Sequence, residues 1–362
     1  MKILHTEASC GWGGQEIRIL EESRGLIERG HQVSVACPAH ARLATEAVRY
    51  GVPVVPMPIE FRTFKGFSAL RHHLAAQQPD IVNTHSSADS WLAALACATL
   101  AHPPAIVRTR HISAPVSGNF ANRWLYRQAR QIVTTGESLR QHLVATLGLD
   151  AGQVVSVPTG IDPIRFSPAA NKAAAKAALG LDPAFTHIGI VATLRSWKGH
   201  LFLLDAFAQL GRHDLHLLIV GEGPMQSPIK EKIAALGITH RVTLTGQRTD
   251  PECWLQAMDI FCLPSYANEG VPQAILQAML CALPIVTTPV GAILEAVRDG
   301  ESALVTPPKD ATAIATAIDR IVSNPELAMR LGMTARNEAL EKFGFERMSE
   351  RMEAVFIKAM KQ

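Results

Sequence analysis

Short apolar runs alternate with segments of helical spacing along most of the chain. The runs in the first half are rich in valine and isoleucine, and the segments between them repeat apolar residues every three or four positions. This alternation predicts βαβ units and a parallel, doubly wound sheet. Strands are expected at residues 2–6, 31–36, 80–84, 105–109, 131–135 and 154–157, and helices at 15–29, 68–77, 90–100 and 138–147.

A second series of the same kind follows after an interruption. Residues 163–184 contain several prolines and an alanine- and lysine-rich stretch, which predicts a linker with a short helix at 171–179. The pattern therefore predicts an α/β protein with two Rossmann-like domains, residues 1–166 and 167–344, facing a central cleft. The second-half strands are expected at 187–192, 215–220, 241–245, 259–263, 284–288 and 303–306, and only helices from 311 to a last helix at 345–360.

Length and composition agree with two domains. A chain of 362 residues exceeds one usual core, and 48% of it is hydrophobic. We find neither an apolar stretch of membrane-spanning length nor a signal-peptide pattern, so we expect a soluble, cytoplasmic protein. The six cysteines form no Cys-x-x-Cys pair and lie mostly in apolar runs, so we expect reduced core residues rather than disulfides or a zinc site.

The net charge is +3, and its excess lies in the first half. Residues 1–166 hold 16 Lys and Arg against 12 Asp and Glu, whereas the remainder holds 19 against 20. Such a cluster predicts contact with a phosphate-bearing partner or peripheral contact with the inner membrane, unless it is only a solvated helix face. Nucleic acid is disfavoured because no binding module is recognised. Much of the excess comes from Arg108, Arg110, Arg123, Arg127 and Arg130.

The loops after the strands hold the candidate chemistry, because ligands bind at the carboxyl ends of strands in open α/β sheets. Gly13 and Gly14 end a loop that leads into the first helix, where glycine lets a ligand approach the backbone closely. The loop lacks the Gly-x-Gly-x-x-Gly spacing, and no acidic residue ends the second strand. Both omissions argue against a dinucleotide site.

An apolar run at 259–264 delivers Glu269 into a glycine-containing loop just before a helix. Pro272 suits the first position of that helix. Gln273 and Gln277 lie four residues apart on one face of an otherwise apolar helix. A buried amide without a partner costs about 1–3 kcal/mol, so the pair either bonds to neighbouring loops or faces a ligand.

Arg195 and Lys198 precede the helix expected at 200–210. Cations oppose the dipole at a helix N-terminus, and a bound anion would resolve the conflict. Two cations could hold a diphosphate without metal, and the sequence contains no Asp-x-Asp motif. His85 and His111 follow successive strands; two such histidines are candidates for binding or proton-linked roles, although a lone histidine is more often structural.

The chain resembles the large retaining glycosyltransferase family 4, with the GT-B fold, over essentially its whole length. The resemblance implies metal-independent, retaining transfer of a hexosyl-type sugar from a nucleotide-diphosphate sugar to a cell-envelope glycan or lipid-linked acceptor, as in lipopolysaccharide biosynthesis. It also implies that residues 345–362 form a helix crossing back to the N-terminal, acceptor-binding domain. It rests on Gly13-Gly14, His85, His111, Thr159-Gly-Ile-Asp162, Lys198-Gly199, Gly221-Glu-Gly-Pro224, Gly246, Pro264-Ser265, Glu269, Pro289-Val-Gly291 and Glu295.

The resemblance also assigns roles to residues. Glu269 and His111 would contact the donor sugar, with His111 near the reacting carbon, and Lys198 would neutralise the diphosphate. Gly14 and the backbone amides of Gly270 and Val271 would approach the phosphates. The remaining substrate-binding candidates are Gly13, His85, Arg195, Gly223, Gln247 near the base, and Gln277 near the ribose.

Two replacements depart from the family pattern at the site. Gln277 stands where the family usually has a second glutamate, and Thr193 stands where it usually has an arginine, for which Arg195 is the nearest substitute. These departures keep two alternatives open: a nucleotide-sugar epimerase of GT-B fold, or a non-catalytic nucleotide-sugar-binding protein. The base and sugar of the donor and the identity of the acceptor are not specified by the sequence.

Overall fold

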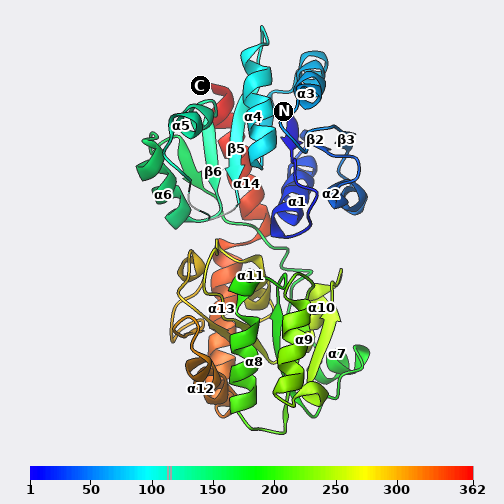
Figure 1. The fold of residues 1–362 in the computed structure, drawn as a ribbon, viewed down its shortest axis with the longest axis vertical. Helices are drawn as coiled ribbons and strands as arrows, with labels where there is room; N and C mark the ends of the chain where they lie inside the picture. The colour runs from blue at the N-terminus through cyan, green and yellow to red at the C-terminus, as the bar shows by residue number, and fades with distance from the viewer. Residues whose placement is uncertain (112–113, 115, 362) are drawn as a thin grey trace. The chain divides into compact units, whose positions relative to one another are not determined.

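The computed structural model describes residues 1–111, 114 and 116–361, and it divides into two compact units. The first unit comprises residues 1–160 and the C-terminal segment that begins at Phe345, and the second comprises Ile161–Gly344. Each unit is built on a parallel sheet flanked by helices (Figure 1). No helix in the described part of the chain is long and apolar enough to span a membrane.

The first unit contains a seven-stranded sheet in the order β3-β2-β1-β4-β5-β6-β7. All neighbouring strands pair in parallel. The edge strand β3 was not predicted, because three residues ending in proline are too short to show a period. The strands are β1 (Lys2–Thr6), β2 (Gln32–Cys37), β3 (Val54–Pro56), β4 (Ile81–Thr84), β5 (Ala105–Arg110), β6 (Gln131–Thr134) and β7 (Val154–Ser156).

The last helix, α14 (Phe345–Lys361), packs within the first unit beside α1 (Gly14–Glu28), as the red and blue helices of Figure 1 show. Its apolar face buries Met348, Met352 and Phe356 in the core, and Arg29 pairs with Glu353 at 2.7 Å. The other helices of this unit are α2 (Arg42–Glu46), α3 (Phe64–Gln77), α4 (Ser87–Ala98), α5 (Phe120–Arg127) and α6 (Glu137–Leu147), with the 3₁₀ helix η1 (Ala47–Tyr50).

The second unit contains a six-stranded sheet in the order β10-β9-β8-β11-β12-β13, again with parallel pairing. Its strands are β8 (Thr186–Val191), β9 (Leu215–Val220), β10 (Val242–Gly246), β11 (Ile260–Leu263), β12 (Ile285–Thr287) and β13 (Leu304–Val305). Its helices are α7 (Lys172–Ala178), α8 (His200–Gln209), α9 (Gln226–Ala235), α10 (Pro251–Ala257), α11 (Gln273–Leu280), α12 (Ala311–Val322) and α13 (Pro325–Lys342), with 3₁₀ turns η2 (Ser196–Lys198), η3 (Thr239–Arg241) and η4 (Ile293–Glu295).

The segment predicted as a linker is an integral part of the second unit. Phe166 is buried in its core, and Leu179 and Leu181 pack against that core. Lys176 on α7 is buried and pairs with Asp259 at 2.7 Å. The prediction that this segment is a linker was therefore wrong, although the short helix predicted within it is present as α7. The units divide at 160/161 rather than at the predicted 166/167, because Ile161 and Phe166 join the second core.

Both sheets have a point at which the strand order reverses direction. In the first sheet it lies between β1 and β4, and in the second between β8 and β11. The loops that leave such neighbouring strands diverge to opposite faces of the sheet, so a crevice opens at their carboxyl ends, where ligands bind in open α/β sheets. Most of the candidate residues named above lie in the loops after these four strands.

Candidate functional site

Lys198 and Glu269 meet at the carboxyl edge of the second sheet. Lys198 ends η2, in the connection after β8, and Glu269 lies in the connection after β11. Their side chains form an ion pair in which Nζ is 2.7 Å from Oε1 and 2.9 Å from Oε2. Glu269 is 4% exposed, whereas the Lys198 side chain is 19% exposed. The structure thus brings together two residues that lie 71 positions apart in the sequence.

Glu269 is held by a second donor and by its own loop. The Ser265 hydroxyl donates to Oε1 at 2.5 Å, and the hydroxyl of Thr288 donates to the Ser265 carbonyl. Gly291 packs directly on the loop: a Cβ at this position would lie 2.0 Å from the Glu269 carbonyl oxygen, and its φ is +61°. Only glycine combines this conformation with this close approach. The carboxylate is therefore fixed in position before any ligand arrives.

Gly199 has the corresponding role beside Lys198. Its φ is +78°, and a Cβ there would lie 2.0 Å from the carbonyl oxygen of Pro264. The Tyr266 amide donates to the Trp197 carbonyl at 2.8 Å, so the loops after β8 and β11 are joined by backbone as well as by side chains. This contact explains the Lys-Gly pair in the sequence: glycine after Lys198 lets the two loops close on each other.

Helix α11 begins one residue later than predicted. Pro272 precedes the helix with ψ +125°, so it is the N-cap rather than the first helical residue, and the prediction was wrong on this point. Gln277 is 8% exposed, and its side-chain amide has no hydrogen-bond partner among the described residues. Gln273, on the same face, is half-buried and does have a partner. Of the two glutamines, Gln277 is the one that its neighbours leave unsatisfied.

The remaining second-unit candidates lie in loops at the same edge. Gly270 is half-buried and Val271 buried, directly after Glu269. Gly223 follows β9 and packs against Leu194, with 2.7 Å between its would-be Cβ and the Leu194 carbonyl oxygen. Arg195 and Gln247 are exposed. The Arg195 guanidinium lies 5.7 Å from the Trp197 ring centre and makes no hydrogen bond or ion pair with Lys198 or Glu269 in the described part of the chain, so the ion pair does not depend on it.

Three histidines form a continuous chain at the carboxyl edge of the first sheet. His85 Nδ1 lies 2.9 Å from His111 Nε2, and His85 Nε2 lies 2.9 Å from Nδ1 of His5. The rings of each neighbouring pair are stacked, with centres 5.1 and 5.2 Å apart. His5 was missed as a candidate; the signal that could have found it is its place near the end of β1, beside β4 and therefore close to His85.

Burial keeps this chain of imidazoles neutral. Desolvation lowers the pKa of His5 to about 3 and holds the pKa values of His85 and His111 well below their usual range, with a further lowering of the His85 pKa from the neighbouring histidines. Asn83 fixes the direction of the hydrogen bonds. Its Oδ1 accepts from Thr109, so its Nδ2 faces His5 Nδ1 at 3.4 Å. With His5 Nδ1 as acceptor, the network assigns the protons of His85 and His111 to Nε2.

Two buried carboxyls flank the β1–α1 loop. Asp89 accepts from the Thr6 hydroxyl at 2.8 Å and from the His85 amide at 2.9 Å. Glu7 accepts from the amide of Ser9 at 2.7 Å. Burial, with a contribution from Asp89, raises the pKa of Glu7 to about 8. The sequence analysis did not single out Glu7, whose position directly after β1 was the available signal. It ties down the loop that carries the candidate glycines.

The two candidate glycines at the start of α1 differ from those of the second unit. Gly13 has an extended φ of −174°, which any residue adopts, and the nearest atom to its would-be Cβ is Glu16 Oε2 at 3.8 Å. The chain itself therefore supplies no steric reason for glycine at position 13. Gly14 is the exposed first residue of α1.

The arginines predicted to form one basic surface are dispersed. Arg108 is 6% exposed and lies over the Tyr126 ring, and the Arg110 guanidinium donates to the carbonyl of Ala114. Arg123, Arg127 and Arg130 are exposed. The expectation of a single five-arginine cluster was wrong, because Arg108 lies in β5, a central strand that is buried on both faces.

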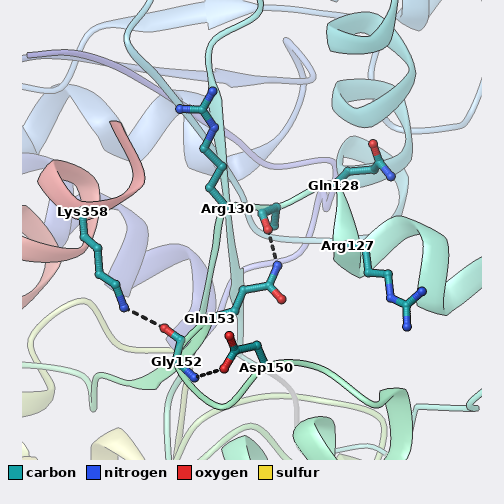
Figure 2. Close-up of a pocket in the computed structure, with 8 residues that line it drawn as sticks. Arg127, Gln128, Arg130, Asp150, Gly152, Gln153 and Lys358 are labelled. Carbon is teal, nitrogen blue, oxygen red and sulfur yellow. Dashed lines mark hydrogen bonds between the residues drawn. The ribbon is translucent and has the colours of Figure 1, made fainter. Parts of the chain in front are cut away.

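Arg127 and Arg130 line a shallow cavity of about 460 Å³ together with Lys358, Asp150 and Gly152 (Figure 2). Lys358 donates to the Gly152 carbonyl at 2.7 Å. Apart from Lys358 on α14, these residues come from segments that lead into β6 and β7, so the cavity lies at the amino ends of those strands. It is therefore not part of the candidate site, which lies at the opposite edge.

Comparison with known proteins points in one direction. A family model described as Glycosyltransferase Family 4 matches residues 12–165, and one described as Glycosyl transferases group 1 matches residues 186–324. The lipopolysaccharide core biosynthesis mannosyltransferase LpsB of Rhizobium meliloti is 32% identical over 252 residues, covering 61% of this chain and 71% of that protein.

Two solved structures are similar over nearly their whole length. A glycosyltransferase from Rickettsia africae has a TM-score of 0.88 at 20% identity, covering 99% of this chain and 98% of its own. Anabaena Alr3699/HepE in complex with UDP-glucose has a TM-score of 0.84 at 19% identity, covering 98% of each chain. At this identity the likeness concerns the fold.

Proposed function

Because this chain belongs to glycosyltransferase family 4 and has the GT-B fold, we propose that it is a metal-independent, retaining glycosyltransferase acting on a nucleoside-diphosphate sugar. The acceptor that we propose is a cell-envelope glycan or a lipid-linked oligosaccharide. The observation that carries the proposal is the partly buried Lys198–Glu269 pair at the strand-order switch of the second sheet.

Lys198 is suited to the donor diphosphate. The Lys198 side chain is partly exposed, whereas its counter-ion Glu269 is buried. An incoming anion can therefore contact the ammonium while Lys198 remains paired with Glu269. The backbone amides of Gly270 and Val271 precede α11 and can donate hydrogen bonds of the kind that bind phosphate. The complex of the similar Anabaena protein with UDP-glucose supports a nucleotide-sugar donor.

Glu269 is suited to hold sugar hydroxyls rather than to attack the sugar. Both of its oxygens already accept hydrogen bonds, from Lys198 and from Ser265, which fixes its orientation and lowers its nucleophilicity. We therefore infer no covalent enzyme intermediate. In the proposed step the acceptor oxygen bonds to the anomeric carbon on the face from which the diphosphate leaves, and the departing phosphate oxygen takes the acceptor proton.

His111 would contribute a neutral hydrogen-bonding group. Its Nε2 proton is donated to His85, so its Nδ1 is left to accept from a sugar hydroxyl. A neutral imidazole adds no charge where an oxocarbenium-like centre develops. His85 and His5 act through His111, as positioning residues. No neighbouring atom of the described chain requires glycine at position 13. The absence of a side chain there is therefore consistent with a ligand that approaches the start of α1 closely.

The envelope acceptor rests on the relative LpsB, whose name assigns it to lipopolysaccharide core biosynthesis. The exposed Arg123, Arg127 and Arg130 on the first unit could meet an anionic membrane surface.

The alternative reaction is the epimerisation of the nucleotide sugar. Conversion of the donor by the isolated protein, without any acceptor, would favour that alternative.

The test is a release assay for nucleoside diphosphate with UDP-, GDP- and ADP-sugars and envelope-glycan acceptors. We expect release only with donor and acceptor together, and no increase when Mg²⁺ or Mn²⁺ is added to the EDTA-treated enzyme. The NMR spectrum of the product should show the anomeric configuration of the donor. Inverted product, or a requirement for Mg²⁺, would overturn the corresponding part of the proposal.

A further inference from the structure

Three potential metal ligands converge on the first unit, outside the residues assigned above. They are the thiol of Cys10, the imidazole of His40 and the carboxylate of Glu60. Cys10 Sγ lies 3.3 Å from His40 Nε2, and this nitrogen lies 3.5 Å from Glu60 Oε2. One ligand atom from each residue lies within 4.8 Å of the other two. No other such group occurs in the described ranges.

The topology explains how distant residues reach one place. Cys10 follows β1, His40 follows β2 and Glu60 follows β3, and these strands are neighbours in the order β3-β2-β1. Because the strands are parallel, their carboxyl ends meet at one edge of the sheet, and each delivers one ligand there. The convergence is therefore a property of the sheet and not of one flexible loop.

The separations are close to those of a tetrahedral zinc centre. With zinc–sulfur bonds near 2.3 Å and zinc–nitrogen or zinc–oxygen bonds near 2.0–2.1 Å, adjacent ligand atoms of a tetrahedron lie about 3.3–3.6 Å apart. The Sγ–Nε2 separation of 3.3 Å is about 0.2 Å shorter than the sulfur–nitrogen edge of such a tetrahedron, and the Nε2–Oε2 separation of 3.5 Å is slightly longer than its nitrogen–oxygen edge, so a small side-chain adjustment would seat the ion. A thiolate, an imidazole and a carboxylate form a mixed donor set that suits zinc far better than magnesium or calcium.

The geometry points to a transition-metal site at Cys10, His40 and Glu60 that binds Zn²⁺ with three protein ligands and leaves a fourth position for water. This site is independent of the proposed donor chemistry, since it uses none of the residues placed there. Cys10 lies in the β1–α1 loop, four residues before Gly14. An ion bound to all three ligands would therefore link that loop to the loops after β2 and β3. The expectation of no zinc site rested on the spacing and apolar surroundings of the cysteines, which do not address ligands contributed by separate loops.

The test uses the full-length, untagged protein, freed of metal by a chelator and titrated with Co²⁺ and Zn²⁺. Cobalt bound by a thiolate gives a charge-transfer absorption band in the near ultraviolet. We expect this band to saturate at one Co²⁺ per chain and to disappear when Zn²⁺ is added. Zn²⁺ should also raise the midpoint of thermal unfolding, because a ligand that binds only the folded state stabilises it.

Single-ligand variants decide the assignment. Cys10→Ser should abolish the charge-transfer band, and His40→Gln and Glu60→Gln should each weaken Zn²⁺ binding by at least about 100-fold, more than the loss of an outer-shell partner. Cys253→Ser, which removes another partly exposed cysteine in the second unit, is the matched control and should leave both readouts unchanged. His40 is exposed and the other two ligands are half-buried, so these substitutions should not prevent folding.

Two results would overturn the inference. If saturating Co²⁺ gives no thiolate band, the three side chains form only a hydrogen-bonded cluster in which Glu60 accepts from its neighbours. If Zn²⁺ binds as tightly to the Cys10→Ser variant as to the wild type, the metal is held elsewhere. Both results leave the proposed glycosyl transfer untouched, because that reaction is assayed with donor and acceptor and does not require this ion.

Discussion

A buried carboxylate with one partly exposed counter-ion lies at the carboxyl edge of the second sheet. Glu269 is 4% exposed, and its two carboxylate oxygens accept hydrogen bonds from Lys198 and Ser265. An unpaired charge in such a place is strongly destabilising, so Lys198 has a structural role in addition to any contact with ligand. Experiments on this pair must therefore measure ligand binding separately from the stability of the free protein.

Gln277 provides a test of how the site tolerates charge. Gln277 is 8% exposed, and its amide, which is not fully buried, has neither a hydrogen-bond partner nor a cation beside it among the described residues. We expect Gln277→Glu to lower the free energy of unfolding by about 1–2 kcal/mol, because it buries an uncompensated carboxylate, and to change donor affinity by less than about tenfold. Urea denaturation and calorimetric titration measure the two effects. A gain in transfer activity of more than tenfold would instead indicate a degraded ribose site.

The neutral histidine chain predicts a loss of stability in acid. The pKa of His85 in the folded protein is lowered, so below pH 6.5 the unfolded chain binds a proton that the folded chain does not, and stability falls as the pH falls. Between pH 6.5 and 5.0 one such histidine contributes a loss of about 2 kcal/mol. Glu7 and Glu22, whose pKa values are raised to about 8 and about 7, act in the opposite sense in this window.

A comparison of variants isolates the histidine contribution. The carboxyls act equally in wild type and in His85→Asn, so urea denaturation at the two pH values should show wild type losing about 2 kcal/mol more than the variant. Equal losses would mean that His85 is protonated in the folded protein, contrary to its burial at 5% exposure.

At the scale of elements, the loops at the carboxyl edge of the second sheet are fixed by close backbone contacts. The Pro289–Gly291 turn after β12 rests on the backbone of Glu269, and Gly199 rests on Pro264. The loops after β8, β11 and β12 therefore support one another, and the ion pair lies among them. Disturbing one contact should affect the site through the position of Glu269.

Gly291→Ala tests this support, with Gly300→Ala as its matched control. Both glycines have positive φ, +61° and +72°, but only Gly291 has a neighbour within 4 Å of the added Cβ. We expect Gly300→Ala to cost about 1 kcal/mol, from backbone strain alone, and Gly291→Ala to cost at least 1–2 kcal/mol more and to weaken donor binding. Thermal unfolding with and without UDP-glucose measures both. Equal effects of the two substitutions would show that the turn does not position Glu269.

The sequence predicted helices and strands well where hydrophobic periodicity is strong. It predicted structure poorly where long-range contacts determine it. The long central strands of both sheets follow from their apolar runs, because parallel strands are buried on both faces. The edge strand β3 is too short for a pattern, and residues 163–184 read as a linker because prolines hid the burial of Phe166. Glu269 and Lys198 were predicted by position, but their direct pairing, and the chain from His111 to His5, are long-range contacts that no local pattern encodes.

At the scale of the whole molecule, the chain leaves the first unit at residue 160 and returns to it at Phe345. Helix α14 completes the core beneath β1 and β5, so the first unit depends on the last residues of the chain. The two cores are composed of separate sets of residues. We therefore expect each unit to respond to damage in its own core.

Two phenylalanine truncations test this independence. Phe356 is fully buried in the first unit and Phe261 in the second, and removing either side chain should cost about 3–5 kcal/mol. Hydrogen exchange followed by mass spectrometry should show Phe356→Ala accelerating exchange in residues 1–160, and Phe261→Ala accelerating it in 161–344. A uniform acceleration along the whole chain in either variant would show that the units unfold as one.

The measurement that tests the central claim most directly is the thermal-unfolding midpoint of wild type and Lys198→Ala, each with and without UDP-, GDP- and ADP-sugars. The variant's own midpoint without ligand accounts for the structural part of the ion pair. We predict that one nucleotide sugar raises the wild-type midpoint, since binding to the folded state stabilises it, and that this rise is lost in Lys198→Ala. An equal rise in both proteins, or none in wild type with any donor, would contradict the assignment of this site to the nucleotide sugar.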